Sequence, residues 1–119
     1  MEKNLITRII EFSSLCSSED RELVEEMIHS AADYVKAVVT METAAYNVLG
    51  LEGSHFREVR ESTDRSRTIA HDDFITRVNV VNKLCAIYGV PPLYTGGAAR
   101  RDYGSFALEI VSEIFINRR

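Results

Sequence analysis

Two side chains in the most polar stretch of the sequence could carry out chemistry together. Arg67 and His71 stand four residues apart within a densely charged segment, residues 55–74. Side chains at this spacing lie on one face of a helix. There a guanidinium could hold a phosphate or phosphodiester while an imidazole moves a proton near neutral pH. Arg67 and His71 are therefore candidate catalytic residues and also candidates for binding an anion.

The same polar residues fall where a helix is expected to bury its apolar face. Counting back from Phe74 by about 100° per residue places His71 and Arg67 within about 60° of the direction of the core. Arg60 falls within the same sector further back, and Asp64 lies just outside it. The apolar stripe thus becomes polar without turning away from the protein interior.

Glu42 is a matching polar residue on the apolar stripe of the preceding helix, so it should also face inward. If the two helices form an antiparallel hairpin around residues 51–52, Glu42 comes opposite Arg60 or Glu61, and we predict an ion pair between Glu42 and Arg60. Two interpretations remain open: a salt-bridge network that fixes helix register, or a polar pocket that binds a small anionic ligand. The predicted ligand-binding residues are Glu42, Arg60, Asp64, Arg67 and His71.

No spacing in the sequence indicates a metal ion or another cofactor. Glu58, Glu61 and Asp64 recur every three residues, and Glu22 forms a similar pair with Glu25 or Glu26. Such carboxylates can bind Mg²⁺ when two helices face each other, but here they are expected on solvated faces. Zinc-ligand spacing, a Gly-rich phosphate loop and a nucleophile elbow are all absent from the sequence. We therefore expect neither a metal nor a cofactor.

Long helices are expected to carry these residues. Apolar residues recur at intervals of three and four over residues 3–16, 18–50 and 54–88, and no stretch alternates with a period of two. Gly50 and Gly89 are suited to end the second and third of these helices.

The C-terminal part should contain a loop followed by a last helix. Residues 94–102 show no periodicity, and Asp102 or Ser105 is expected to cap a helix that carries Phe106 and Ile110. The sequence therefore predicts one all-α domain over residues 1–119, a bundle of four or five helices with a long antiparallel helical hairpin.

The composition excludes several classes of protein. Of the 119 residues, 45% are hydrophobic and 27% are charged, as in a soluble globular domain. The net charge of −4 argues against a protein that coats DNA or an anionic membrane by bulk charge. The longest apolar run covers only residues 84–88, and the N-terminal residues lack the apolar stretch of a signal peptide. We expect a cytoplasmic protein with no membrane role, in which Cys16 and Cys85 are buried thiols.

Three resemblances extend this interpretation. The length, the helical pattern and the run from Glu61 to Asp72 resemble a small bacterial family of all-helical proteins of unknown function. This resemblance implies a fold and a bacterial cytosolic setting but no activity. A third and weaker likeness, to MazG-like nucleotide pyrophosphohydrolases, rests on the carboxylates, whose two acidic pairs are too far apart here.

The chain is also similar to HEPN ribonucleases in its Arg65 and His71, which are separated by five residues, with the polar Ser66 following the arginine. This resemblance implies a metal-independent Arg/His pair that acts on RNA and is assembled across a helical dimer, so Arg65 joins the candidate catalytic residues. A straight helix, however, rotates Arg65 to about 120° from His71, so the match requires a bend between them or a helix that starts near residue 67.

These observations favour a binding or regulatory module with a polar cluster inside the bundle. The alternative is a toxin-type ribonuclease that uses an Arg/His pair, and the sequence does not decide whether the protein is an enzyme. Small anionic ligands and RNA are the candidate partners. We also expect a homodimer, because long helices with exposed apolar edges tend to pair.

Overall fold

The described part of the chain forms four α-helices and a π-helical turn. In the computed structural model these elements are α1 (Leu5–Leu15), α2 (Ser18–Asn47), α3 (Ser54–Ile87), α4 (Arg100–Val111) and η1 (Ser112–Ile116). The structure describes the backbone of residues 4–47 and 54–116 and the side chains of residues 4–39 and 64–115. No strand occurs within these ranges, so the predicted all-α class is confirmed. None of the described helices has the length and apolar content needed to cross a membrane.

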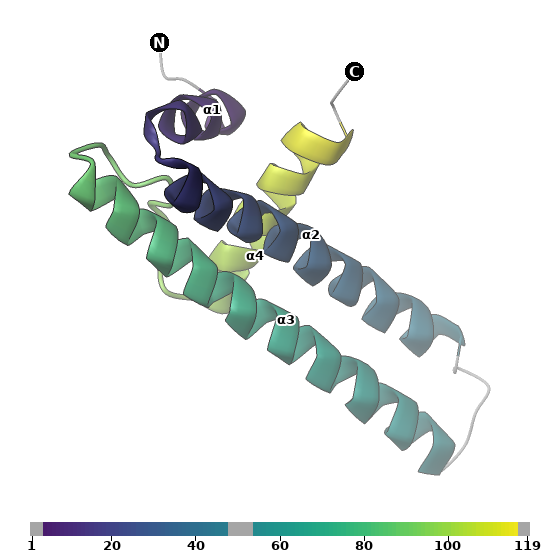
Figure 1. Ribbon diagram of the computed structural model, residues 1–119. Coiled ribbons are helices and arrows are strands. Elements are labelled where there is room, and N and C mark those ends of the chain that lie inside the picture. The colour runs from purple at the N-terminus through teal and green to yellow at the C-terminus, as the bar shows by residue number, and fades with distance from the viewer. Residues whose placement is uncertain (1–3, 48–53, 117–119) are drawn as a thin grey trace.

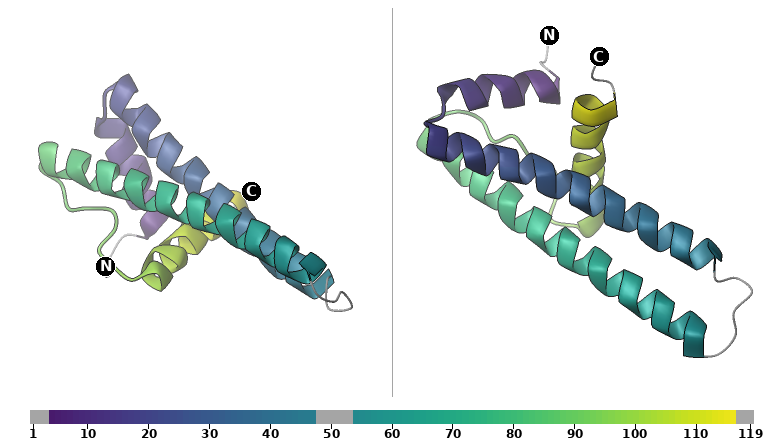
Figure 2. Two further views of the ribbon diagram at one scale, coloured as in Figure 1. Left: turned by 90° about the horizontal axis from the view of Figure 1, so that it is seen from below. Right: turned by 45° about the vertical axis from the view of Figure 1, so that its right-hand side comes forward.

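The two longest helices, α2 and α3, lie side by side and run in opposite directions (Figure 1). They set the long dimension of a molecule that measures 55 × 28 × 26 Å. Both α1 and α4 pack against the half of this pair that contains the start of α2, and the other half extends beyond them (Figure 2). The pair is therefore covered by further helices over only part of its length.

The core lies where α2, α3 and α4 meet. Each helix contributes side chains at intervals of three and four, which places them on a single face, as the sequence predicts. The ring of Phe74 stacks parallel to that of Tyr34 at 6.3 Å and lies tilted against Phe106 at 6.1 Å. The fully buried apolar side chains of this core are Val24, Met27, Ala31, Phe74, Val78, Val81, Cys85, Ala107 and Ile110.

The first helix is joined to the end of the chain through its N-terminal amides. Asn4 caps α1, because its side-chain oxygen accepts a hydrogen bond from the backbone N–H of Thr7 at 2.9 Å. The carboxylate of Glu113 in η1 accepts a second bond from the N–H of Ile6 at 2.9 Å. A carboxylate is favourable at this end of a helix because the helix dipole is positive there.

Side chains from two helices hold the connection between α3 and α4. Gly89 adopts a φ of 71°, the left-handed conformation that commonly ends a helix. The amide of Asn82 pairs with the backbone of Tyr94, donating to its carbonyl at 2.9 Å and accepting from its N–H at 3.2 Å. Arg8 of α1 donates to the carbonyls of Pro92 and Leu93 at 2.8 and 2.9 Å. The connection is thus fixed although it has no regular structure.

The start of the last helix differs from the sequence-based prediction. Helix α4 begins at Arg100, and its N-cap residue is Ala99, whose side chain makes no capping hydrogen bond. The prediction that Asp102 or Ser105 caps this helix is therefore wrong. Asp102 lies within the first turn, where a carboxylate is favoured by the helix dipole as well as at the cap itself.

The two cysteines are buried and carry free thiols, as predicted. Burial raises the pKa of both thiols above the ordinary value of 9.0, chiefly because a thiolate would lose its hydration there. Raised values describe inert structural thiols rather than nucleophiles.

Candidate functional site

His71 occupies a core position at the boundary of the packed region. Its side chain is only 3% exposed, and its ring lies 5.1 Å from that of Tyr34 on α2. Nε2 lies 3.4 Å from the backbone carbonyl oxygen of Arg100, the first residue of α4. A carbonyl oxygen only accepts hydrogen bonds, so this contact is a hydrogen bond in the tautomer that carries its proton on Nε2.

The second ring nitrogen of His71 has no hydrogen-bond partner although it is buried. The nearest charged group is the carboxylate of Asp72, whose Oδ1 lies 3.6 Å from Nδ1, beyond hydrogen-bonding distance. Buried polar atoms in native proteins are almost always paired, so an unpaired one requires an explanation.

Arg67 lies one turn before His71 and has a similar unpaired nitrogen. Its Nη2 donates to Oδ1 of Asp64 at 2.7 Å, while its Nε is buried and has no partner. The Arg67 side chain as a whole is 31% exposed and that of Asp64 is 55% exposed. Among the side chains that the structure describes, Arg67 Nε and His71 Nδ1 are the buried nitrogens or oxygens without a hydrogen bond.

The N-terminus of α4 reaches this position because α4 packs closely on α2. A Cβ atom at Gly104 would lie 3.3 Å from the hydroxyl oxygen of Tyr34, closer than most Cβ atoms approach another atom. Glycine therefore allows the approach that sets the carbonyl of Arg100 beside the imidazole. The first turn of α4 also presents the exposed side chains of Arg100 and Arg101.

Charged groups of both signs lie near the two unpaired nitrogens. The guanidinium of Arg67 favours a negatively charged group, whereas the carboxylate of Asp72 lies 3.6 Å from Nδ1 of His71. Asp64 pairs with Arg67, and the side chains of Asp64 and Asp72 are both exposed to solvent. We name Arg67, His71 and the first turn of α4 the Arg67–His71 site.

The structure places the remaining predicted site residues as follows. Asp64 contacts Arg67 through the ion pair described above. Arg65 is exposed, and α3 is continuous through residues 65–71, so the bend that would bring Arg65 to the same face as His71 is absent (Figure 1). The side chains of Glu42 and Arg60 lie outside the described residues, and so does their predicted ion pair.

The sequence reasoning missed two residues that shape the site, Tyr34 and Arg100. Tyr34 falls on the same helical stripe as the core residues of α2, so periodicity could have placed it inward. Nothing in the local sequence signals that the carbonyl of Arg100 meets an imidazole 29 residues earlier in the chain.

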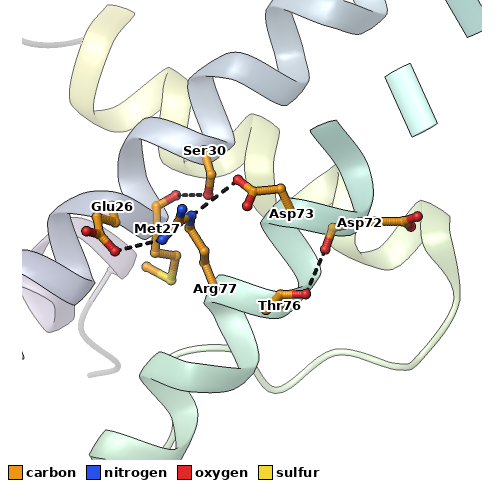
Figure 3. Close-up of polar contacts among 7 residues, drawn as sticks. All are labelled: Glu26, Met27, Ser30, Asp72, Asp73, Thr76 and Arg77. Carbon is orange, nitrogen blue, oxygen red and sulfur yellow. Dashed lines mark hydrogen bonds and ion pairs between the residues drawn. The ribbon is translucent and has the colours of Figure 1, made fainter. Parts of the chain in front are cut away.

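A second polar cluster bridges α2 and α3 on the surface. Arg77 donates to Glu26 on α2 at 2.7 Å and to Asp73 on α3 at 3.2 Å (Figure 3). Asp73 points toward Arg77 in this view, whereas the carboxylate of the adjacent Asp72 points away from it. Each of the three side chains is 38–50% exposed. This cluster ties the two helices together in one register and leaves Asp72 on the side of His71.

No metal centre is formed by the described residues, since no three His, Cys, Asp or Glu side chains among them lie close enough together to hold an ion.

Comparison with known proteins identifies the family. Residues 3–119 match the family of proteins of unknown function designated DUF3232, so the chain belongs to this family. The predicted membership in an all-helical family of unknown function is thereby confirmed. None of these comparisons shows a relationship to HEPN ribonucleases. No curated protein and no solved structure matches the chain.

Proposed function

We propose that the protein is a binding or regulatory module that takes a small anion, a phosphate or a carboxylate group, at the Arg67–His71 site. The observation that carries this proposal is the pair of buried, unpaired nitrogens one helical turn apart, Arg67 Nε and His71 Nδ1. A buried polar group without a partner destabilises a protein by about 1–3 kcal/mol. A ligand that forms hydrogen bonds with both nitrogens recovers this energy and so binds tightly for its size.

The charges around the site support an anion over a neutral ligand. Arg67 keeps its positive charge at all physiological pH values, and a helix N-terminus with no side-chain cap favours negative groups. The chain as a whole carries a net charge of −4, so attraction of an anion to this site comes from Arg67 and not from the net charge.

Access to the site requires movement of Arg67, because both unpaired nitrogens are covered. The side chain is held by an ion pair to Asp64, whose carboxylate is 55% exposed. Exposed ion pairs contribute no more than about 1 kcal/mol, so the guanidinium can leave Asp64 for an incoming anion at little cost. Asp64 is in this way part of the proposed site as the resting partner of Arg67.

The wider assembly is a further part of the proposal. We propose that α2 and α3 form an antiparallel hairpin within a bundle, with a Glu42–Arg60 ion pair beyond the described side chains. Homodimerisation is supported by large apolar side chains that remain exposed on the two helices, Val39 at 55% and Ile69 at 70%. The resemblance of residues 61–72 to a bacterial family supports a bacterial cytoplasmic setting.

One observation favours a second function, cleavage of RNA. A neutral imidazole whose Nε2 donates to a carbonyl keeps a lone pair on Nδ1, as a general base requires. Arg67 stands in position to hold a phosphodiester. The burial of His71 weighs against this function, because a polynucleotide backbone would have to reach a side chain that is 3% exposed.

Phosphate titration with matched arginine variants tests the proposed function. We expect phosphate to raise the melting temperature of the wild-type protein and of Arg65→Gln, in which an exposed arginine of the same helix is neutralised. Stabilisation by a ligand at 100 times its Kd is about 2.7 kcal/mol. Arg67→Gln should lose this effect. Equal stabilisation of Arg67→Gln and wild type at matched ionic strength would overturn the proposal.

An RNA cleavage assay separates the two functions. We expect no cleavage of single-stranded RNA by the wild-type protein. Cleavage that is abolished in His71→Asn without a change in melting temperature would instead establish the ribonuclease and assign proton transfer to His71.

A further inference from the structure

The side of α3 opposite the core carries a second stripe of residues. Six side chains recur along it at intervals of four, three, four, three and four residues, so they lie within about 80° of one another on the helix. The centre of this stripe lies about 160° from the centre of the buried stripe between His71 and Cys85. We name it the outer stripe, and it consists of Ile69, Asp73, Thr76, Val80, Lys83 and Ile87.

The outer stripe is exposed along its whole length. All six side chains are accessible to solvent, and the isoleucines at its two ends are the most exposed of its apolar members, Ile69 at 70% and Ile87 at 77%. In the view from below, α3 lies along the near side of the molecule with the other helices behind it (Figure 2). Alternating intervals of three and four are those at which one helix contacts another in a coiled coil. The outer stripe therefore has the spacing of a helix-packing surface but no helix against it in the described part of the chain.

The spacing of the outer stripe is the same when it is read from either end. A second copy of α3 that runs in the opposite direction, about an axis midway between Thr76 and Val80, therefore meets the stripe in register. Ile69 of each copy then lies opposite Ile87 of the other, and Thr76 lies opposite Val80. The apolar ends of the stripe thus contact apolar ends.

The charged residues of the stripe are complementary in the same arrangement. Asp73 of each copy lies opposite Lys83 of the other, whereas in a parallel pair each would face its own like charge. Asp73 accepts a hydrogen bond from Arg77 through Oδ2, and a carboxylate has a second oxygen with which to accept from an ammonium group. Glu26 and Asp73 both pair with Arg77, so the charge of this arginine beside the stripe is neutralised within its own copy.

We propose that two copies of the chain associate through the outer stripe, with their α3 helices antiparallel about a two-fold axis. This inference rests on the homodimer of the proposed function and adds the face through which it forms. The contact extends over about 27 Å of helix, at 1.5 Å per residue. Arg67 and His71 lie on the opposite side of α3, so each copy keeps its Arg67–His71 site uncovered by the other.

Sedimentation equilibrium of charge variants tests the pairing. We expect the dimer dissociation constant to increase by about tenfold in Lys83→Glu, because two attractions between the copies become two repulsions. Asp73→Lys should weaken the dimer in the same way. An equimolar mixture of the two variants should regain the wild-type dissociation constant, because every charged pair between them then joins opposite signs. This recovery also shows that both variants are folded.

Cysteine cross-linking tests the direction and the register of the helices. Ile69→Cys and Ile87→Cys, mixed in the presence of a mild oxidant, should form a disulfide with each other, and neither should cross-link efficiently by itself. The native thiols of Cys16 and Cys85 are buried and serve as the background. Cross-linking of each variant with itself but not with the other would establish a parallel pair and overturn the antiparallel arrangement.

An apolar control on another helix separates this face from other faces. Ile87→Asp should raise the dissociation constant by at least about tenfold, because it places a carboxylate in the apolar end of the contact. Leu108→Asp should leave the dissociation constant unchanged, since Leu108 is 53% exposed but lies on α4.

The other outcomes distinguish this inference from the proposed function. A dimer that withstands both Ile87→Asp and Lys83→Glu would overturn the outer stripe as the interface and leave the homodimer standing. A wild-type protein that stays monomeric throughout the measured concentrations would overturn the homodimer and this inference with it.

Discussion

The two halves of α3 differ in how they are covered, and the difference locates the site. Between residues 71 and 85 the central stripe of α3 is at most 3% exposed, because α2 and α4 both pack against this half; this stripe consists of His71, Phe74, Val78, Val81 and Cys85. Before His71 the exposure rises at once, to 31% for Arg67 on the same face. The change from apolar to polar residues on one face of one helix thus coincides with the end of the cover that α4 provides.

This comparison gives a physical reason for the polar stripe. An apolar side chain is stabilised when neighbours exclude water on all sides, which requires the third helix. At the edge of that cover, long amphipathic side chains such as arginine can bury their stems and keep their charged ends near solvent. His71 stands at the boundary, where it is buried yet adjacent to charged groups.

The largest expected effect on stability compares a substitution in the covered half of α3 with one in the uncovered half. Phe74→Ala should lower the free energy of unfolding by about 3–5 kcal/mol, because a fully buried ring that packs against Tyr34 and Phe106 is replaced by a cavity. Ile69→Ala, at a position 70% exposed, should change it by less than about 0.5 kcal/mol in the monomer. Urea denaturation measures both, and equal losses would remove the distinction between the halves.

A smaller loss of stability is expected when the hydrogen bonds between α3 and the connection to α4 are removed. Asn82→Ala removes both hydrogen bonds to the backbone of Tyr94 and should lower the free energy of unfolding by about 1–3 kcal/mol. Asn79→Ala is the control, since Asn79 is exposed one turn earlier on the same helix. If the two variants have the same denaturation midpoint, the connection contributes nothing to holding α4 in place.

The surface cluster should contribute least among the interactions between α2 and α3. Arg77→Ala is expected to lower the free energy of unfolding by no more than about 1 kcal/mol, because its ion pairs with Glu26 and Asp73 are half exposed and screened by solvent. A double-mutant cycle with Glu26→Ala measures the coupling, which should decrease at high salt. A coupling above about 2 kcal/mol would mean that this cluster is far less solvated than its exposure indicates.

The free energy of unfolding should not depend on the ionisation of the cysteines at neutral pH, but at alkaline pH it should. Because burial raises the pKa of the Cys85 thiol above 9.0, the native state retains the proton that the unfolded chain releases. The contribution of this buried, protonated thiol to the free energy of unfolding is fully present below pH 9.0. It is lost as the pH rises through the pKa of the native thiol.

Chemical denaturation of wild type and Cys85→Ala between about pH 8 and 10 measures this effect. The variant should lose part of the alkaline decrease, and the remainder should come from Cys16 and Tyr94, whose pKa values are also raised by burial. Parallel curves for the two proteins would show that Cys85 is not desolvated in the native state.

Much of the fold could be predicted from local patterns. The three-and-four spacing of apolar residues gave the helices and the inward direction of Phe74, Val78 and His71, because that spacing is a property of the helix itself. The start of α4 was not predicted, since its N-cap residue Ala99 makes no side-chain capping hydrogen bond and so leaves no local signal in the sequence.

In the candidate site, too, the sequence determined one part and the tertiary structure another. The sequence by itself determined that Arg67 and His71 share one face of α3 and that this face points toward the core, because helical geometry depends only on positions along the chain. Only the tertiary structure decided which atoms they meet: the carbonyl of Arg100 on Nε2, the ring of Tyr34 beside the imidazole, and no partner for Nδ1. Those contacts depend on how closely α4 approaches α2 at Gly104, and this packing distance between distant segments is not encoded in any local pattern of residues.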